Sequence, residues 1–171
     1  MSGSTAPGSR HAALATPLGD LTIVCSSTGV LATFFDDDEC DMHLEPASSS
    51  RGSRADTLAR AARREAELYF AGSLRTFSVP PDLTLVSGTF GRRVLEVVAT
   101  IPYGELWTYG DVAGMAGSPR AARAAGSALA GCPIELFVPC HRVVHAGNTM
   151  GGYGRHEDRK RWLLRHEGAG A

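Results

Sequence analysis

A cysteine and a histidine stand side by side in the stretch "ELFVPCHRVV", where Cys140 and His141 follow an apolar run and a proline. An unpaired cysteine is most often a small buried residue. Polar side chains directly after an apolar run, however, are costly to bury without partners. A cysteine that attacks carbon needs a base or a positive charge nearby, because a thiol is mostly protonated at neutral pH. His141 can supply that base, directly or through one water, so the pair indicates a nucleophile.

A third group must orient the imidazole and stabilise its cation. The acids available late in the chain are Glu157, Asp158 and Glu167, and the residues alone leave the choice among them open. A Cys–His hydrolase is one alternative, which would need an oxyanion hole and would turn over.

A metal site is the weaker interpretation of the cysteines. Cys40 and His43 are closely spaced and Cys25 lies nearby, but no second Cys or His pair completes a zinc-finger pattern. We therefore predict no bound metal.

The composition is that of a soluble globular protein of one domain or two small ones. The chain has 171 residues, of which 43% are hydrophobic and 20% charged. No apolar run approaches the roughly 20 residues that span a bilayer, and "MSGSTAPGSR" lacks the apolar middle of a secretory signal. We predict a cytoplasmic protein without a membrane partner, whose cysteines are free thiols.

Charge is divided unevenly along the chain. Residues 1–85 hold seven Arg against eleven Asp and Glu, a balance of −4, whereas residues 86–171 hold ten Arg and Lys against seven acids, a balance of +3. A mildly basic second half suits an anionic partner such as a phosphate backbone.

The first half predicts a small α/β domain over residues 10–85. Residues 1–9 are rich in Gly, Ser and Pro and are expected to be a disordered tail. Residues 11–35 alternate as short strands between turns, and an acidic loop at 36–45 follows. Residues 54–72 have helical apolar spacing, and the proline-bearing "SVPPDLTLVSG" marks the domain boundary.

The second half, residues 86–171, predicts a helical domain. Helices are expected over 89–101, from near Thr108 to 117, and over 119–131 with Ser118 as N-cap, and "EDRKRWLLRHEG" predicts a last helix that a glycine ends. "IELFVP" has the pattern of a strand. The middle two helices suggest a helix-turn-helix, although small-residue helix pairs are also common packing units. Arg123 is the only long charged side chain in "AARAAGSALAG", and an arginine on such a small-residue helix surface favours DNA.

The combination of motifs resembles a known family. "VPCHRVV", preceded by "IPYGELWTYGDVAGMAGSPRAARAAGSALAG" and followed by "GGYGRHEDRKRWLLRHEG", resembles the O6-alkylguanine-DNA alkyltransferases over residues 88–168. In the first half only "TPLGDLTI" and "ELYFAG" carry the likeness. The resemblance implies an α+β protein with an RNase H-like N-terminal domain and a C-terminal winged helix-turn-helix domain.

The resemblance also implies roles. Cys140 would accept the alkyl group by direct displacement, His141 would be the water-mediated base, and Glu167 its orienting carboxylate. Arg123 would fill the gap that a flipped guanine leaves in the stack. Its neighbours on the helix that faces DNA would be Ala122, Ala124 and Gly126.

Five further residues would hold the flipped base. Tyr109 would help to rotate the nucleotide and donate a hydrogen bond to the base. Tyr153 and Leu129 would form the walls of the pocket. The carbonyls of Cys140 and Val143 would accept from the guanine amino group, and the N–H of Gly154 would meet the guanine oxygen.

Two positions depart from the family pattern. Cys132 stands where the family has an Asn hinge whose amide both donates and accepts, which a thiol does poorly. Gly154 stands where a serine is frequent. The positions that correspond to the zinc ligands of some members are Ser26 and Leu31, which again predicts no metal.

The function that follows is direct reversal of DNA alkylation. Methyl or small alkyl groups would move from guanine O6, and from thymine O4, to Cys140 in a single turnover without a cofactor. The partner would be double-stranded DNA, gripped through the minor groove with little sequence preference by a monomer. The alternative is an alkyltransferase-like protein that binds the lesion without repairing it; such proteins lack the reactive cysteine.

Overall fold

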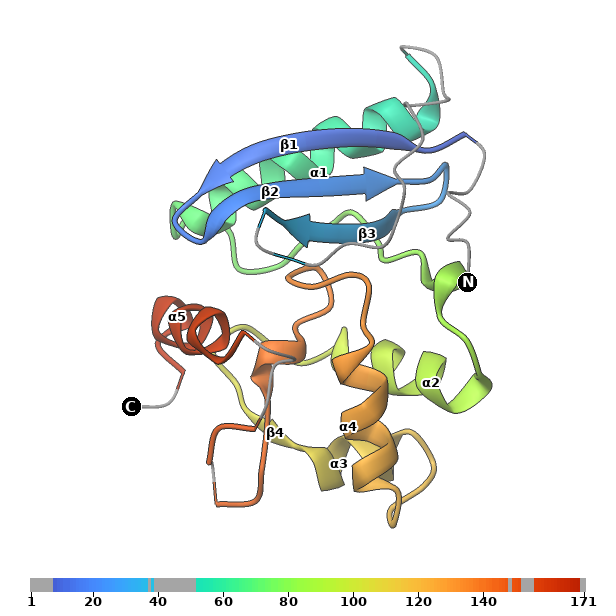
Figure 1. Cartoon of the computed structure of the whole chain (residues 1–171), viewed down its shortest axis with the longest axis vertical. Coiled ribbons are helices and arrows are strands. Elements are labelled where there is room, and N and C mark those ends of the chain that lie inside the picture. The colour runs from blue at the N-terminus through green and yellow to red at the C-terminus, as the bar shows by residue number, and fades with distance from the viewer. Residues whose placement is uncertain (1–7, 37, 39–51, 148, 152–155, 170–171) are drawn as a thin grey trace. The chain divides into compact units, whose positions relative to one another are not determined.

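The chain forms two compact units, residues 1–85 and residues 86–171. In this computed structural model, strands followed by one long helix make up the first unit, and the second is mainly helical (Figure 1). Because strands and helices are segregated along the chain, the predicted α+β class is confirmed. No helix in the part of the chain that the structure describes is long and apolar enough to cross a membrane. The described residues are 8–36, 38, 52–147, 149–151 and 156–169.

Three antiparallel strands in the order β1-β2-β3 form the sheet of the first unit. The turn from β1 to β2 is fixed by Thr16, whose hydroxyl donates to the Gly19 carbonyl at 2.6 Å and accepts from the Leu18 N–H at 3.1 Å. The strands predicted within residues 11–35 are therefore confirmed, with β1 beginning one residue earlier. Their bounds are β1 Arg10–Thr16, β2 Gly19–Cys25 and β3 Val30–Phe35.

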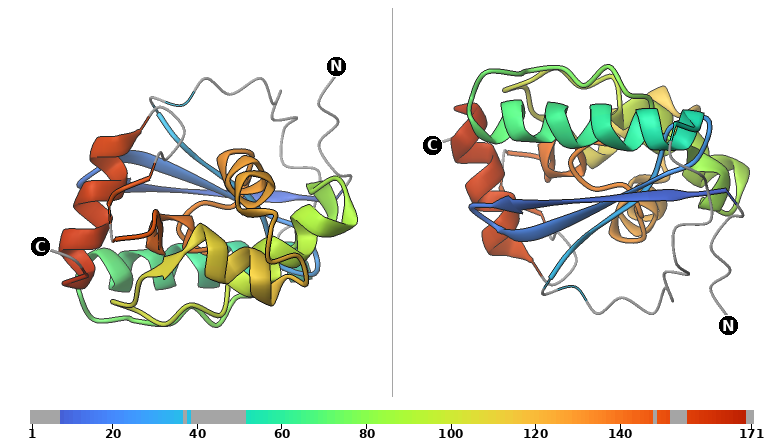
Figure 2. Two further views of the ribbon diagram at one scale, coloured as in Figure 1. Left: turned by 90° about the horizontal axis from the view of Figure 1, so that it is seen from below. Right: turned by 90° about the horizontal axis from the view of Figure 1, so that it is seen from above.

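Helix α1 (Arg54–Phe70) lies along one face of this sheet (Figure 2). It begins where the Ser53 side chain accepts from the Asp56 N–H at 3.1 Å, an N-cap that satisfies one of the free backbone donors. Its buried stripe is mostly alanine, which lets the helix approach the strands closely. Ser9, which the sequence placed in the disordered tail, is buried as well.

The proline-bearing connection after α1 is packed and not loose. The Val30 N–H donates to the Pro80 carbonyl at 2.9 Å, and the Asp82 N–H donates to the Val30 carbonyl at 2.7 Å. This bridge places the Pro80 carbonyl against Gly29, where an added Cβ would lie 2.1 Å from the oxygen. Only a residue without a side chain fits at position 29.

In the second unit, helices surround a short parallel pair of strands. β4 pairs with β5, with Trp107 opposite Val143. Helix α2 is shorter than expected, because it ends at Val98. Its N-cap is Gly88, so no side chain accepts a hydrogen bond from the first turn. The bounds are α2 Thr89–Val98, β4 Trp107–Thr108, α3 Tyr109–Met115, α4 Ala122–Ala130, β5 Val143–Val144 and α5 Glu157–Glu167.

The two short helices α3 and α4 pack against each other. Helix α3 begins near Thr108 as expected, and Thr108 is its N-cap. The Thr108 hydroxyl accepts from the Asp111 N–H at 3.1 Å, while the Asp111 carboxylate accepts from the Thr108 N–H at 2.9 Å. The predicted start of α4 at residue 119 is wrong. The Ala121 N–H donates to the Ser118 carbonyl at 2.9 Å and closes a separate turn, so α4 begins only at Ala122.

The predicted strand in "IELFVP" is also wrong. The Val138 N–H donates to the Ile134 carbonyl at 3.0 Å, and Leu136 adopts a positive φ of 74°. The segment therefore folds back on itself, with its apolar side chains buried. A short apolar run cannot distinguish a buried strand from such a turn.

We predict that Gly29→Ala destabilises the protein by about 1–3 kcal/mol, because the new Cβ must displace the backbone of residue 80. Urea unfolding followed by circular dichroism measures the change. The matched control is Gly114→Ala in α3, where no atom lies within 4 Å of the added Cβ; it should stabilise by about 0.5–1 kcal/mol. Equal effects of the two substitutions would contradict the close contact.

Candidate active site

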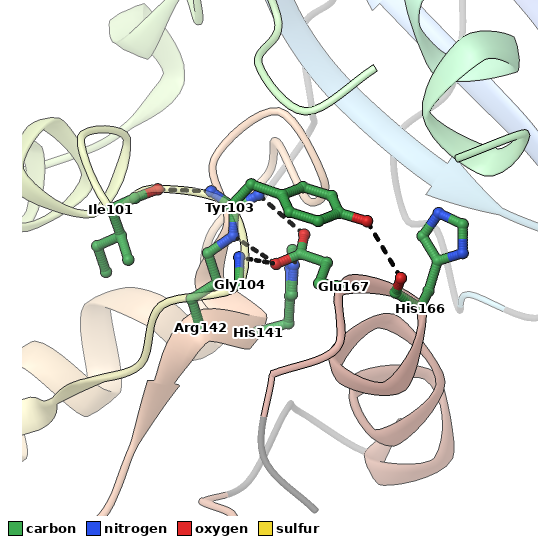
Figure 3. Close-up of polar contacts among 7 residues, drawn as sticks. All are labelled: Ile101, Tyr103, Gly104, His141, Arg142, His166 and Glu167. Carbon is green, nitrogen blue, oxygen red and sulfur yellow. Dashed lines mark hydrogen bonds and ion pairs between the residues drawn. The ribbon is translucent and has the colours of Figure 1, made fainter. Parts of the chain in front are cut away.

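A buried carboxylate lies at the centre of the site. The side chain of Glu167, at the end of α5, is fully buried and accepts from Arg142 through both of its oxygens, each at 2.8 Å. His141 Nε2 lies 2.9 Å from Oε1, and the Gly104 N–H donates to Oε2 at 3.2 Å (Figure 3). Burial alone would raise the pKa of this carboxyl, but the His141 and Arg142 hydrogen bonds hold the pKa well below its usual range.

Arg142 is fixed on its other edge too. Its Nη1 donates to the Ile101 carbonyl at 2.5 Å, and the guanidinium carbon lies 5.7 Å from the centre of the Tyr103 ring. The Tyr103 hydroxyl in turn donates to the His166 carbonyl at 3.1 Å (Figure 3). The loop after α2 and the end of α5 are thereby tied to one buried ion pair.

His141 is poised as a base by this arrangement. Its Nε2 faces the ionised Glu167, so Nε2 carries the proton and donates it. Nδ1 is buried and has no hydrogen-bond partner among the described residues. Burial outweighs the carboxylate and lowers the pKa of His141, so the imidazole is neutral near pH 7 and Nδ1 offers its lone pair.

Cys140 begins the 3₁₀ turn Cys140–Arg142, against which α5 packs. Its N–H donates to the Val138 carbonyl at 2.8 Å, and only 4% of the residue is exposed. The hydrogen bond with the Cys132 thiol, and then burial, raise the pKa of Cys140 well above its ordinary value, while Lys160 opposes them. The acceptor candidate is therefore a neutral thiol that needs a base before it can attack.

Lys160, the only lysine, is fully buried in α5. Its ammonium donates to the Val143 carbonyl at 2.6 Å. Burial lowers the pKa of Lys160 to about 8, although the neighbouring Cys140 favours the charged form. The group is therefore still mostly cationic at pH 7 and supplies positive charge beside the thiol.

Tyr109 is held between two glycines at the start of α3. An added Cβ would lie 3.7 Å from its ring at Gly126 in α4, and only 2.5 Å from its hydroxyl at Gly151. The ring also lies 5.1 Å from that of His145. Burial, and then the nearby Cys140, raise the pKa of Tyr109, so its hydroxyl stays protonated and can donate.

The predicted DNA-facing residues lie in the first half of α4. Arg123 and Ala124 are exposed, whereas Ala122 is half-buried and Gly126 packs beneath the Tyr109 ring. The guanidinium of Arg123 has no ion-pair partner within the described ranges. Leu129 lies half-buried in the last turn of the same helix.

The structure brings most of the predicted site residues together. Sequence reasoning missed Arg142 as the partner of the carboxylate, Gly151 as the support of Tyr109, and Lys160, whose only signal was its being the single lysine. No cluster of three or more potential metal ligands occurs in the described segments. Predicted residues that lie outside them are Tyr153, Gly154, Cys40, His43 and most of the acidic loop.

Comparison with known proteins matches both units to one family. Residues 10–83 match the 6-O-methylguanine DNA methyltransferase, ribonuclease-like domain, and residues 89–169 match its DNA binding domain. The chain is 38% identical to a methylated-DNA–protein-cysteine methyltransferase from Shigella flexneri, over 91% of this chain and 93% of the relative. It is 41% identical to a DNA base-flipping protein from Thermus thermophilus, over 91% and 98%.

The fold of the chain is also similar to that of solved structures. The crystal structure of a Mycobacterium tuberculosis protein, OGT, in complex with DNA superposes with a TM-score of 0.78 at 34% identity, over 92% of this chain and 91% of that one. The chain belongs to the O6-methylguanine-DNA methyltransferase family. The resemblance of the "PCHRV" region and its flanking motifs is therefore confirmed.

We predict that Glu167→Gln destabilises the protein by about 3–5 kcal/mol, because it leaves the buried Arg142 without a counter-charge. Urea unfolding at pH 7 measures the loss. The pKa of Glu167 is depressed by folding, so its contribution is fully present above its unfolded value of about 4.3 and fades as the pH falls toward the folded pKa.

The difference between wild type and Glu167→Gln should therefore shrink in acid. Asp158→Asn, in the first turn of the same helix with a side chain 99% exposed, is the matched control and should change stability by about 0.5 kcal/mol or less. A pH-independent difference, or equal losses in both variants, would contradict the role of the carboxylate.

Proposed function

We propose that the protein repairs alkylated DNA by direct reversal, taking a methyl or small alkyl group from guanine O6, and from thymine O4, onto Cys140. The observation that carries the proposal is a buried thiol in one turn with His141, whose imidazole is held by the Glu167–Arg142 pair. Membership of the family supports it, and so do relatives named methylated-DNA–protein-cysteine methyltransferase.

The geometry supports a proton path away from the thiol. Cys140 passes its proton through one water to Nδ1 of His141, the nitrogen without a protein partner in the described part of the chain. Glu167 stabilises the imidazolium that forms. The sulfur then attacks the alkyl carbon, the C–O bond breaks, and its electron pair stays on the guanine, which takes up a proton. The thioether has no easy route back to a thiol, so one protein repairs one lesion without a cofactor.

The base must leave the stack for this attack, because its O6 substituent is out of reach within the duplex. The protonated Tyr109 hydroxyl donates to the flipped base. The Val143 carbonyl already accepts from Lys160 and keeps a second lone pair for the guanine amino group. Leu129, Tyr153 and Gly154 complete the pocket in this proposal.

DNA binding is assigned to the α3–α4 helix-turn-helix. The exposed Arg123 extends from a helix face of small residues that includes Ala122, Ala124 and Gly126, which suits close approach to the minor groove and insertion into the stack. Affinity comes mainly from phosphate contacts and depends little on sequence. Every reacting group belongs to one chain, so a monomer suffices, and a free acceptor thiol suits the reducing cytoplasm.

A second candidate is a protein that flips and binds the lesion without transfer. The relative from Thermus thermophilus named a DNA base-flipping protein favours it, as does the replacement of the hinge Asn by Cys132. Cys140 and its complete base network favour transfer.

We predict that incubation with duplex DNA containing O6-methylguanine adds one methyl group per protein, on Cys140. Digestion with trypsin and a glutamyl endopeptidase cuts after Glu135 and separates the peptide of Cys140 from that of Cys132, so mass spectrometry assigns the methyl. Cys140→Ala should gain no methyl yet still shift the DNA in a gel.

Three results would oppose this proposal. Multiple turnovers would indicate a hydrolase, and a methyl group on the Cys132 peptide would move the acceptor. An unmodified wild-type protein that still shifts the DNA would establish the lesion-binding alternative.

We also predict that Arg123→Ala slows transfer from duplex DNA by at least about tenfold, because nothing then offsets the lost stacking energy of a few kcal/mol. Reaction with free O6-benzylguanine, which needs no flipping, should change less than about twofold. Arg120→Ala is the matched control, since it removes an equal charge from an exposed position just before α4. An equal loss on both substrates would contradict the inserted-arginine role.

A further inference from the structure

An ion pair ties helix α5 to the segment that leads into the acceptor thiol. Arg159 Nη1 donates to Glu135 Oε2 at 3.1 Å, and the side chain of Arg159 is only 5% exposed. Exposed ion pairs contribute little, because water screens them, but this guanidinium is almost withdrawn from water. Loss of the partner of such a buried charge is strongly destabilising. The pair therefore holds α5 and the segment together at this point.

The segment that the pair holds, the fold-back of residues 134–138, has a strained backbone. Leu136 has a φ of 74°, and in the part of the chain that the structure describes no other residue except glycine has a positive φ. This conformation is unfavourable for a residue with a side chain and persists only where the surroundings impose it. The Val138 N–H donates to the Ile134 carbonyl at 3.0 Å and closes the fold-back. Backbone strain of this kind is concentrated at functional sites.

The acceptor is attached to the same fold-back. The Cys140 N–H donates to the Val138 carbonyl at 2.8 Å, so the backbone of the acceptor is fixed to the residue that closes the fold-back. A shift of the fold-back therefore moves the thiol relative to His141, whose ring is held separately by Glu167. Chemistry at the thiol is sensitive to such a shift, because a misplacement of about 1 Å can cost about a hundredfold in rate.

The place of Arg159 in α5 points to the same role. The helix begins at Glu157, so Arg159 and Lys160 lie in or next to its first turn. The helix dipole favours anions at this end and disfavours cations, yet both side chains are buried here. Lys160 donates to the Val143 carbonyl at 2.6 Å, after the acceptor in the chain, and Arg159 holds the chain before it. Residues that break a local rule in this way are expected at functional sites.

We propose that Arg159 is a positioning residue for the acceptor. Its ion pair with Glu135 holds the strained fold-back at Leu136 in place. The fold-back in turn fixes the backbone of Cys140, so that the thiol can pass its proton to His141 through one water. Arg159 thus acts through the backbone and not on the reacting atoms. Its effect on transfer rests on the proposed function, whereas its effect on the backbone does not.

The effect on the backbone can be tested without any assay of transfer. In Arg159→Gln the amide hydrogens of Val138 and Cys140 should exchange with deuterated solvent at least about tenfold faster than in wild type, because the fold-back opens more often. NMR spectroscopy measures both rates. The internal control is the Ala116 amide, which donates to the Val112 carbonyl at 2.9 Å at the end of α3. Unchanged rates at the two amides, or an equal acceleration at Ala116, would overturn the proposal.

Three further variants sharpen this test. Glu135→Gln breaks the same pair from its more exposed side, where the side chain is 25% exposed, and should accelerate the same two amides, so the test does not depend on one variant. Arg159→Lys keeps the cation and should retain most of the protection. Arg161→Gln removes an equal charge from the same helix at a side chain 48% exposed. It is the matched control and should exchange like wild type.

Transfer forms the second arm. The single-turnover rate constant is measured at saturating O6-methylguanine DNA, so that a change in DNA affinity does not enter. Arg159→Gln and Glu135→Gln should each lower it at least about tenfold, and Arg161→Gln should leave it unchanged. The double variant of Arg159 and Glu135 should be no slower than the slower single variant, because both substitutions remove one interaction.

Losses that multiply in the double variant, or an unchanged rate constant in Arg159→Gln, would also overturn the proposal. If wild type transfers no methyl group while the amides of Arg159→Gln still exchange faster, the proposed function fails and the hold of Arg159 on the backbone stands. The two ideas are thus separated by one set of variants.

Discussion

The buried carboxylate of Glu167 is the interaction on which the second unit depends. A buried charge without water must be met by hydrogen-bond donors. These come from two separate parts of the chain, Arg142 and His141 in the turn of the thiol and Gly104 after α2, and they meet the carboxylate on a third, α5. Packing this ion pair therefore also sets the tautomer of the imidazole. Fold stability and chemical competence share one set of hydrogen bonds.

Much of the fold could be predicted from local patterns. The capping pattern of α3 and the glycine that ends α5, in the left-handed conformation at Gly168, act over one or two turns and are visible in the residues themselves. The fold-back around Leu136 was not predictable, because a short apolar run has the same pattern of residues in a strand and in a buried turn. The late start of α4 depends on a single backbone hydrogen bond to Ser118.

The sequence likewise predicts some residues of the candidate site and misses others. Cys140 and His141 could be found from their adjacency, but residues alone could not choose among the late acids, because the choice is made by Arg142 across the packed interface with α5. Lys160 was missed because a lysine is normally a solvated charge, and only the tertiary structure shows it buried on the Val143 carbonyl. The sequence pattern does not identify contacts between residues that lie far apart along the chain.

The packing of Tyr109 limits which residue the chain can carry at position 151. An added Cβ at Gly151 would lie 2.5 Å from the Tyr109 hydroxyl and 2.7 Å from its ring, whereas at Gly126 it would meet the ring at an ordinary contact distance of 3.7 Å. Position 151 therefore cannot acquire a side chain while the ring stays in place. We expect positions 109 and 151 to change together or not at all, so that the glycine in one segment depends on an aromatic residue in another element.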